Sequence, residues 1–234
     1  MKKIGLLCLA VVLALGTVGM GFAYWSEPLE IGQNPVSTGN VDVRFYGASS
    51  DDGPGRYDIK EYQYGSAIRW DDKDVGETTI QVVDPHLARL TLSNVYPGYQ
   101  SRIELGMQNY GSIPAEIESV TINNIVDDNG LLDYVKVGGW IQVQCGPSSY
   151  HSKSLASGYP PQSGGPLAGF DVVLFNALKS TQSEPLQTGW KVFLACEDPE
   201  EGDSLGFYIL PGAPEDATLT LDLEVVWTQF NATP

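Results

Sequence analysis

The chain contains little of what most catalytic and nucleic-acid-binding sites require. Of its 234 residues, two are histidines, three are cysteines and 13 are Lys or Arg, against 29 acidic residues, so the formal net charge is −16. No run of Lys and Arg is present that could hold phosphate groups or anionic lipids, both of which need clustered positive charge. These shortages predict that the protein does not bind nucleic acid, and they leave an enzyme almost wholly dependent on carboxylates.

Recognisable catalytic and metal-binding motifs are also missing from the sequence. His86 and His151 are far apart in the sequence, and no Glu lies between two His residues at the spacing of a zinc-peptidase helix. We therefore predict no catalytic, cofactor-binding or metal-binding residue. Calcium stays open as a ligand, because acidic clusters at 71–74, 127–128 and 197–203 carry the oxygen atoms that it prefers. None has the spacing of a twelve-residue calcium loop, and solvated turns are the simpler interpretation.

The single long apolar run lies at the N-terminus. Two lysines precede an uninterrupted apolar stretch over residues 4–23, which ends in small residues. This pattern predicts a signal peptide, residues 1–23, cleaved between Ala23 and Tyr24, and hence a secreted protein located in an extracellular filament or at the cell surface. A retained membrane anchor is the alternative, since a run of this length can span a bilayer. The membrane is expected as a partner only through the uncleaved signal segment.

Cleavage would leave an even number of cysteines. It removes Cys8, so that Cys145 and Cys196 remain in the exported chain. Each ends a strand-like run whose neighbours of the same parity are apolar, which allows both to face one core. We predict a disulfide between them, with two inert buried thiols as the alternative.

Alternation of apolar and polar residues dominates the rest of the sequence. This period of two predicts half-buried strands, and Gly- and Pro-containing turns separate them. Strands are predicted over residues 41–45, 103–107, 141–145 and 219–227, with further short apolar runs over 170–174, 190–196 and 205–210. The longest helix-like segment is 176–183. Many short strands with such turns predict an all-β fold, an antiparallel jelly-roll-like β-sandwich.

The predicted organisation has three parts. A signal peptide is followed by an N-terminal arm and first strand over residues 24–45. Residues 46–234 then form the jelly-roll-like domain. Within it, the segments at about 46–79 and 146–168 are rich in Gly, Ser, Asp and Tyr with weak periodicity, so we predict long surface loops or insertions there.

Three sets of segments, in this order, resemble the TasA/camelysin family of exported biofilm and fibre proteins. They are the signal junction 21–26 with the strand 37–43; the Pro-Gly turn, strand and Asn-Tyr-Gly-Ser turn within 92–115; and the closing strand 220–230 with Trp227-Thr228-Gln229. Together they cover about a third of the chain. The resemblance implies a jelly-roll-like fold and filaments in which the N-terminal segment of one subunit completes a sheet of the next. Some family members are classed as metallopeptidases, but this chain supplies no recognisable zinc ligands.

The segment after the cleavage site suits such a role. Tyr24 would be the new N-terminus, and Trp25, Leu29 and Ile31 share one parity of an extended arm. We expect this donor strand to bind another copy of the chain, giving a homopolymer that other matrix components could join. An ordinary first strand of the protein's own sheet is the alternative interpretation of the arm.

Two other functions remain open. One is a monomeric cell-surface binding module for carbohydrate, with the aromatic residues Trp70, Trp140 and Tyr150 as its contacts. The other is a camelysin-like secreted metallopeptidase. The homopolymer remains the predicted function.

Overall fold

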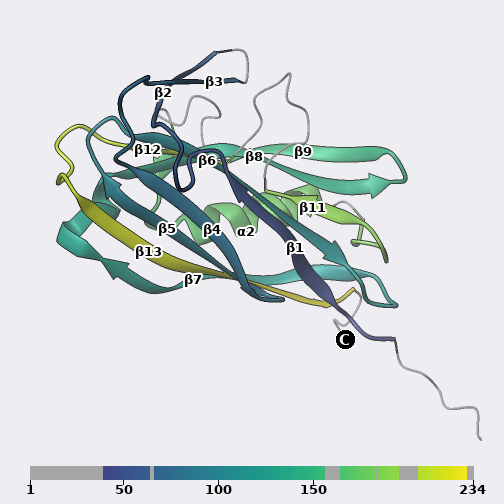
Figure 1. Ribbon diagram of the computed structural model, residues 1–234. Helices are drawn as coiled ribbons and strands as arrows, with labels where there is room; N and C mark the ends of the chain where they lie inside the picture. The colour runs from purple at the N-terminus through teal and green to yellow at the C-terminus, as the bar shows by residue number, and fades with distance from the viewer. Residues whose placement is uncertain (1–38, 64–65, 156–163, 183, 195–204, 231–234) are drawn as a thin grey trace, which may run out of the picture. The chain divides into compact units, whose positions relative to one another are not determined.

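Strands make up most of the residues that the computed structural model describes, which are 39–63, 66–155, 164–182, 184–194 and 205–230 (Figure 1). Every strand pair among them is antiparallel. Two sheets enclose one apolar core to which both contribute. The predicted all-β sandwich is therefore confirmed.

The larger sheet has seven strands. Its main path is β1 (Val43–Ser50), β6 (Gln100–Asn109), β11 (Lys191–Phe193), β8 (Val135–Gly146) and β10 (Gly165–Pro166); β9 (Ser149–Leu155) also pairs with β8, and β12 (Leu205–Ile209) pairs with both β6 and β8. The short strands β11 and β12 occupy successive parts of the slot between β6 and β8. The predicted strands over 190–196 and 205–210 thus belong to one slot of one sheet.

The smaller sheet has four strands, and its alternation is the clearest in the chain. Its order is β4 (Glu77–Asp84), β5 (Leu87–Val95), β13 (Ala217–Gln229) and β7 (Ala115–Asp127). In β13, alternate side chains from Leu219 to Trp227 are buried, as the sequence predicts. A Tyr-Pro-Gly-Tyr turn joins β5 to β6; Gly98 has a φ of 88° there, which the second central position of a type II turn requires.

The predicted loops at 46–79 and 146–168 contain strands, which corrects the sequence-based interpretation. A two-stranded hairpin, β2 (Ile59–Gln63) and β3 (Ser66–Arg69), lies in the first, and β9 lies in the second. Most side chains of β2 and β9 are exposed, so neither strand shows an apolar alternation that a sequence could reveal. Pairing with a neighbouring strand, rather than burial, holds them.

The apolar run over 170–174, which the sequence analysis groups with the strands, begins helix α2 (Phe170–Thr181), and the helix-like segment predicted over 176–183 overlaps the end of that helix. The buried residues Phe170, Leu174, Ala177 and Leu178 recur at helical spacing. A window of five residues is too short to separate that period from a strand. Helix α2 packs against β7 of the smaller sheet and against β8 and β9 of the larger one, so it fills one side of the sandwich (Figure 1). A short 3-10 segment, η1 (Asp128–Tyr134), follows β7.

The compact unit of the sandwich begins at Gly39. Residues 39–45 therefore belong to the domain; in the sequence-based division they end the segment over 24–45, the N-terminal arm and first strand. Among the described residues, no helix is long and apolar enough to cross a membrane.

Candidate functional site

The chain enters the sandwich along the turn that follows β6. The Tyr110 N–H donates to the Asp42 carbonyl oxygen at 2.7 Å, and the Ser112 N–H donates to the Asn40 carbonyl oxygen at 3.0 Å. A Cβ atom on Gly111 would lie 2.4 Å from that Asn40 oxygen, so only glycine permits the close approach. Residues 39–42 are thus fixed to the domain before β1 begins.

A buried asparagine shapes this turn. The Asn109 side-chain amide donates to the carbonyl oxygens of Ile113 and Leu186, and its Oδ1 accepts the Gly111 N–H at 2.9 Å. The end of β13 arrives at the same place, because the Phe230 N–H donates to the Pro114 carbonyl oxygen. Residues 39–42, 109–114 and 230, which come from the three resembling sets of segments, therefore meet at one end of the sandwich.

On the side opposite α2, two edge strands of different sheets face each other. β1 is an outer strand of the seven-stranded sheet and β4 is an outer strand of the four-stranded sheet. The Phe45 N–H donates to the Pro85 carbonyl oxygen at 2.8 Å at one end, and the Thr78 N–H donates to the Asp52 carbonyl oxygen at 2.9 Å at the other. In the described chain no ladder joins the two strands between these points. We call this feature the β1–β4 seam.

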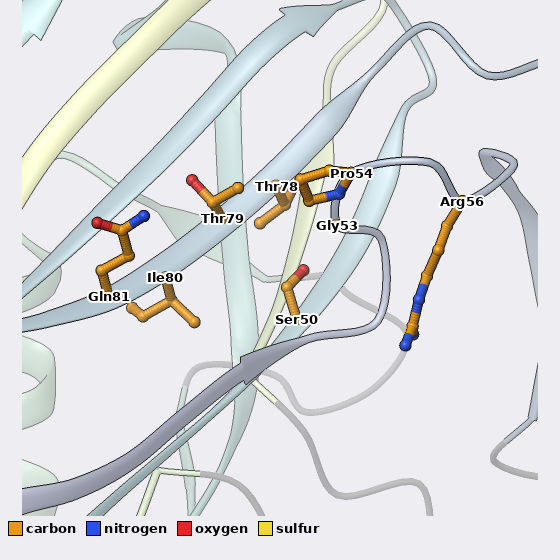
Figure 2. A pocket seen from close by; sticks show the side chains of 8 residues that line it. All are labelled: Ser50, Gly53, Pro54, Arg56, Thr78, Thr79, Ile80 and Gln81. Carbon is orange, nitrogen blue, oxygen red and sulfur yellow. The ribbon is translucent and has the colours of Figure 1, made fainter.

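A groove of about 380 Å³ opens at one end of the seam (Figure 2). It is lined by Ser50 of β1, by Gly53, Pro54 and Arg56 of the following loop, and by Thr78, Thr79, Ile80 and Gln81 of β4. Ile80 is the largest apolar side chain in this lining and is nearly buried. Arg56 is the only charged residue among those that line the groove.

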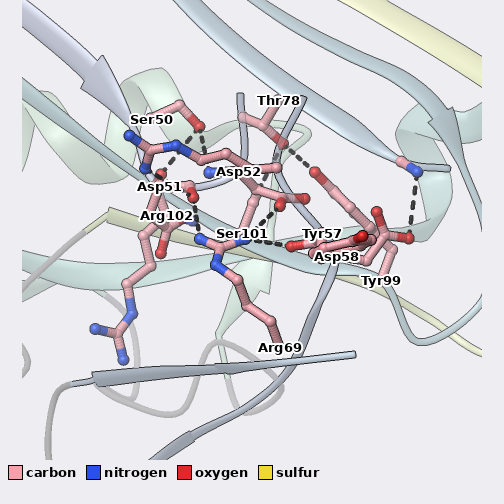
Figure 3. Close-up of polar contacts among 12 residues, drawn as sticks. Ser50, Asp51, Asp52, Tyr57, Asp58, Arg69, Thr78, Tyr99, Ser101 and Arg102 are labelled. Carbon is pink, nitrogen blue, oxygen red and sulfur yellow. Dashed lines mark hydrogen bonds and ion pairs between the residues drawn. The ribbon is translucent and has the colours of Figure 1, made fainter. Parts of the chain in front are cut away.

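A buried polar cluster fastens the loop beside the groove (Figure 3). We call it the Asp52 cluster; it comprises Asp51, Asp52, Asp58, Arg69, Thr78, Tyr99, Ser101 and Arg102. Arg69 donates to Asp52 Oδ1 at 3.0 Å and also to the backbone carbonyl oxygens of Asp51 and Tyr57. Asp51 accepts the Arg102 N–H at 2.8 Å. One guanidinium and one carboxylate thus tie the loop to β3 and β6.

The second half of the cluster fixes the chain after β3. Asp58, which is fully buried, accepts the backbone N–H groups of Val75 and Gly76. The Thr78 hydroxyl is 2.8 Å from the Tyr99 hydroxyl and 2.7 Å from that of Ser101. These bonds hold the start of β4 against the start of β6.

Burial controls the protonation of this cluster. It raises the pKa of Asp52 to about 6, against the opposing effects of the Tyr99 hydroxyl and the Arg69 guanidinium. Burial likewise raises the pKa of Asp51 and of Tyr99. Asp52 Oδ2 is buried and has no hydrogen-bond partner of good geometry in the described chain. Because Asp52 and Asp58 are both closed off from solvent, their arrangement fixes a loop rather than offering a carboxylate to a ligand.

The other acidic clusters are not arranged as metal sites in the described chain. No group of three or more His, Cys, Asp or Glu side chains in those residues could hold a metal ion. Asp127 instead accepts the backbone N–H groups of Leu131 and Leu132 and so caps η1. The cluster over 197–203 lies outside the described residues.

Most residues of the predicted assembly site lie outside the described residues. These are Ala23 and Tyr24 of the cleavage site and Trp25, Leu29 and Ile31 of the donor strand. Cys145 is half-buried at the end of β8 and forms no disulfide with another described residue, whereas its predicted partner Cys196 lies outside the described residues. Their pairing stays a prediction.

The structure only partly gathers the aromatic residues predicted for a binding module. By register, Trp140 on β8 and Tyr150 on β9 share the outward face of the seven-stranded sheet. Trp70 follows β3, where Lys60 Nζ lies 4.9 Å from the centre of its ring. Phe193 joins Tyr150 at 6.0 Å between ring centres.

The sequence alone does not predict the β1–β4 seam or the Asp52 cluster. Its Asp-Asp-Gly-Pro-Gly run over 51–55 indicates only a turn. Two adjacent acids ahead of that turn are a signal for loop-fastening carboxylates, but their partners, Arg69 and the Arg102 N–H, are distant in the sequence.

Comparisons of the chain with models of protein families, with curated proteins and with solved structures find no match.

Proposed function

We propose that the protein is a secreted structural subunit that assembles head-to-tail into extracellular filaments. Its signal peptide would be removed after Ala23, and residues 24–38 would then add as a strand to a neighbouring subunit. The observation that carries this proposal is the pair of edge strands at the β1–β4 seam. Strand edges outside a ladder are templates for pairing with another chain.

The division of the chain supports this arrangement. Its contacts separate residues 1–38 from residues 39–234, and the buried core of the described chain runs from Val43 to Trp227. In the proposed mechanism the segment over 24–38 is the part that is exchanged. A segment donated to the next copy makes a contact that need not close on itself, and such a contact generates a filament.

The chemistry of the segment fits strand addition. Trp25, Leu29 and Ile31 supply large apolar groups of one parity, and the backbone supplies hydrogen bonds to an edge. Ordering an extended segment costs about 1–2 kcal/mol per residue for its backbone alone. Side-chain burial and strand pairing are therefore both needed, which favours a sheet edge beside a groove over a flat surface.

The meeting of three segments at one end of the sandwich supports the resemblance to the TasA/camelysin family. Asn40, Ser112 and Pro114 belong to those segments and are joined directly or through one turn. Their shared role is to fix residues 39–42 to the domain.

Negative-stain electron microscopy tests the proposal. Protein comprising residues 24–234 is expected to form filaments, and the same protein lacking residues 24–34 is expected to remain a folded monomer. Trp25→Ala should reduce assembly without changing the circular dichroism spectrum, because Trp25 precedes the core.

Filaments of normal yield from the deleted protein would contradict the donor-strand mechanism. A misfolded deletion product would instead identify residues 24–34 as part of the protein's own sheet. Monodisperse particles from both proteins would favour a monomeric binding module with Trp70, Trp140 and Tyr150 as its contacts.

A further inference from the structure

Three aromatic side chains from three strands gather on the outward face of the seven-stranded sheet. They are Tyr46 of β1, Phe193 of β11 and Tyr150 of β9, and we call them the aromatic platform. The ring centre of Phe193 lies 6.2 Å from that of Tyr46 and 6.0 Å from that of Tyr150. Strand β6 separates β1 from β11, and β8 separates β11 from β9. The two tyrosines therefore reach Phe193 from opposite sides of the sheet.

The pairing register places the platform on the side of the sheet away from the core. Phe193 pairs with Gly106, whose two neighbours along β6 are core residues. Tyr150 pairs with Gln144, which likewise follows a core residue of β8. Successive residues of a strand point to opposite faces of the sheet, so Phe193 and Tyr150 both face outwards.

Gly106 determines how the Tyr46 ring lies. A Cβ atom at Gly106 would be 2.6 Å from Cζ of Tyr46 and 2.8 Å from its hydroxyl oxygen. The ring therefore covers the place that a side chain of β6 would otherwise occupy. Since 40% of Tyr46 is still exposed, the rest of the ring is open to a ligand. Tyr150 is exposed to the same extent, whereas Phe193 is buried.

The polar groups beside the platform are mostly hydrogen-bond donors, although the chain as a whole is strongly acidic. Lys191 Nζ lies 5.8 Å from the ring centre of Phe193 and forms no ion pair within the described part of the chain. Gln142 of β8 is the register partner of Phe193 on one side and of Ser152 on the other. Glu104, the next outward residue along β6, is already hydrogen-bonded to a serine of β1. An ammonium group, an amide and a hydroxyl suit a hydroxyl-rich ligand.

The exposed aromatic area decides between a protein partner and a smaller ligand. An aromatic side chain has about 150–250 Å² of surface, so two tyrosines at 40% exposure offer about 120–200 Å² together. A stable interface between two proteins takes about 800 Å² from each of them. The platform is therefore too small to be the apolar centre of such an interface, and it fits ligands that have the size of one ring for each tyrosine.

Sugar rings fit this combination of area and polar groups. One face of a pyranose presents C–H groups, which bind the electron-rich face of an aromatic ring, and its rim presents hydroxyls that bond to amide and ammonium groups. We therefore infer that the aromatic platform binds a polysaccharide, and that Tyr46 and Tyr150 stack on separate sugar units of one polysaccharide chain. This function is additional to the proposed assembly, because it uses neither the N-terminal segment nor β4.

Isothermal titration calorimetry of protein comprising residues 24–234 tests the inference. The probes are cellohexaose, N-acetylchitohexaose and maltohexaose, which differ in linkage and substituents and share the pyranose ring. We expect at least one of them to bind. Tyr46→Ala and Tyr150→Ala should each weaken that binding about tenfold, which corresponds to about 1.4 kcal/mol. The matching monosaccharide should also bind about tenfold more weakly, because it can stack on only one of the two rings.

Two control variants make the result specific. Tyr46→Phe keeps the ring and should bind the same probe within about threefold of the unmodified protein. Trp70→Ala removes an aromatic side chain of equal exposure that lies outside the platform, next to the β2–β3 hairpin. Its affinity for the probe should be unchanged.

Gly106→Ala tests the position of the rings rather than their presence. The added methyl group would displace the Tyr46 ring, which is the far end of a flexible side chain, so the variant should fold and yet bind about as weakly as Tyr46→Ala. In protein that already carries Tyr46→Ala, Gly106→Ala should cause no further loss of affinity. A purely structural role of Gly106 would instead lower the melting temperature in both backgrounds and leave sugar binding unchanged.

The outcomes separate sugar binding from the proposed assembly. Failure of all three probes to bind would overturn the inference. Binding that persists in Tyr46→Ala and Tyr150→Ala, or that Trp70→Ala abolishes, would place the sugar site elsewhere and overturn the platform assignment. Self-association of protein lacking residues 24–34, abolished by Tyr46→Ala, would make the platform a contact between copies of the chain. Filaments are needed for none of these measurements, so failure of the proposed function would leave the inference standing.

Discussion

At the scale of single residues, Asp52 is the most unusual group in the described chain. It is fully buried, one oxygen is bonded to Arg69, and the other oxygen has no partner there. A buried carboxylate with an unpaired oxygen favours its protonated form. The loop beside the groove is therefore fastened by a cluster whose charge depends on pH.

The sign of this dependence follows from the two pKa values. The pKa of Asp52 is about 6 in the folded protein, against 3.8 as its ordinary value. Its contribution to stability is complete below about pH 4 and is lost as the pH rises through 6, by up to about 3 kcal/mol. The pKa of Asp222 is lowered by Arg89, so that residue acts with the opposite sign.

Urea unfolding of Asp52→Asn and of the unmodified protein at several pH values isolates this effect. We expect the free energy of unfolding of the variant, relative to the unmodified protein, to rise between pH 4 and pH 7 by up to about 3 kcal/mol. Asp72→Asn, at an exposed position, should show no such trend. Parallel profiles for Asp52→Asn and the unmodified protein would contradict the prediction.

At the scale of single elements, helix α2 fills the space between one edge of the smaller sheet and one edge of the larger sheet. Leu174 and Leu178 are fully buried, whereas Val172 and Val173 on the same helix are exposed. The apolar residues on the two faces of this helix therefore contribute differently to the free energy of unfolding.

Truncation of a buried side chain on α2 should destabilise the protein. Leu178→Ala is expected to lower the free energy of unfolding by about 2–5 kcal/mol, because it leaves a cavity between the sheets. Val173→Ala on the same helix should change it by no more than about 0.5 kcal/mol. Chemical denaturation of both variants measures the difference. Equal decreases in the free energy of unfolding would contradict the role of α2 in filling the space between the sheets.

Strand β4 is an edge strand at which strand addition can be tested by substitution. A lysine on the core-facing parity of an edge strand opposes strand addition, because its charge would be buried. Val82→Lys should therefore prevent filament formation and change stability little, since Val82 is already partly exposed.

The control is Val126→Lys on β7, where Val126 pairs with Thr220 on the outward face of the sheet and is 59% exposed. This variant should assemble normally in a sedimentation assay. Loss of assembly in both variants would indicate a general effect of the added charge and would contradict the prediction.

At the scale of the whole molecule, the sequence predicted those strands in which one face is buried, because apolar and polar residues alternate along them. The alternation in β13 and β8 is visible because their inner faces are buried and their outer faces are polar. β9 and the β2–β3 hairpin left no such imprint, since most of their side chains are exposed. The seam could not be predicted for a different reason. Backbone hydrogen bonds join Phe45 to Pro85 and Thr78 to Asp52. Such bonds do not depend on which side chains are present, so the sequence does not reveal them.

The position of α2 also limits how many neighbours a subunit can have. The helix occupies the side of the sandwich where β7, β8 and β9 would otherwise leave a second opening, and the β1–β4 seam lies at the opposite side. With one segment to give and one seam to receive it, the proposed subunit has a valence of two. Such units grow as unbranched threads that lengthen at their tips. A copy that can give its segment but cannot receive one would act as a chain terminator, so a small fraction of Val82→Lys subunits would shorten every thread in a mixture.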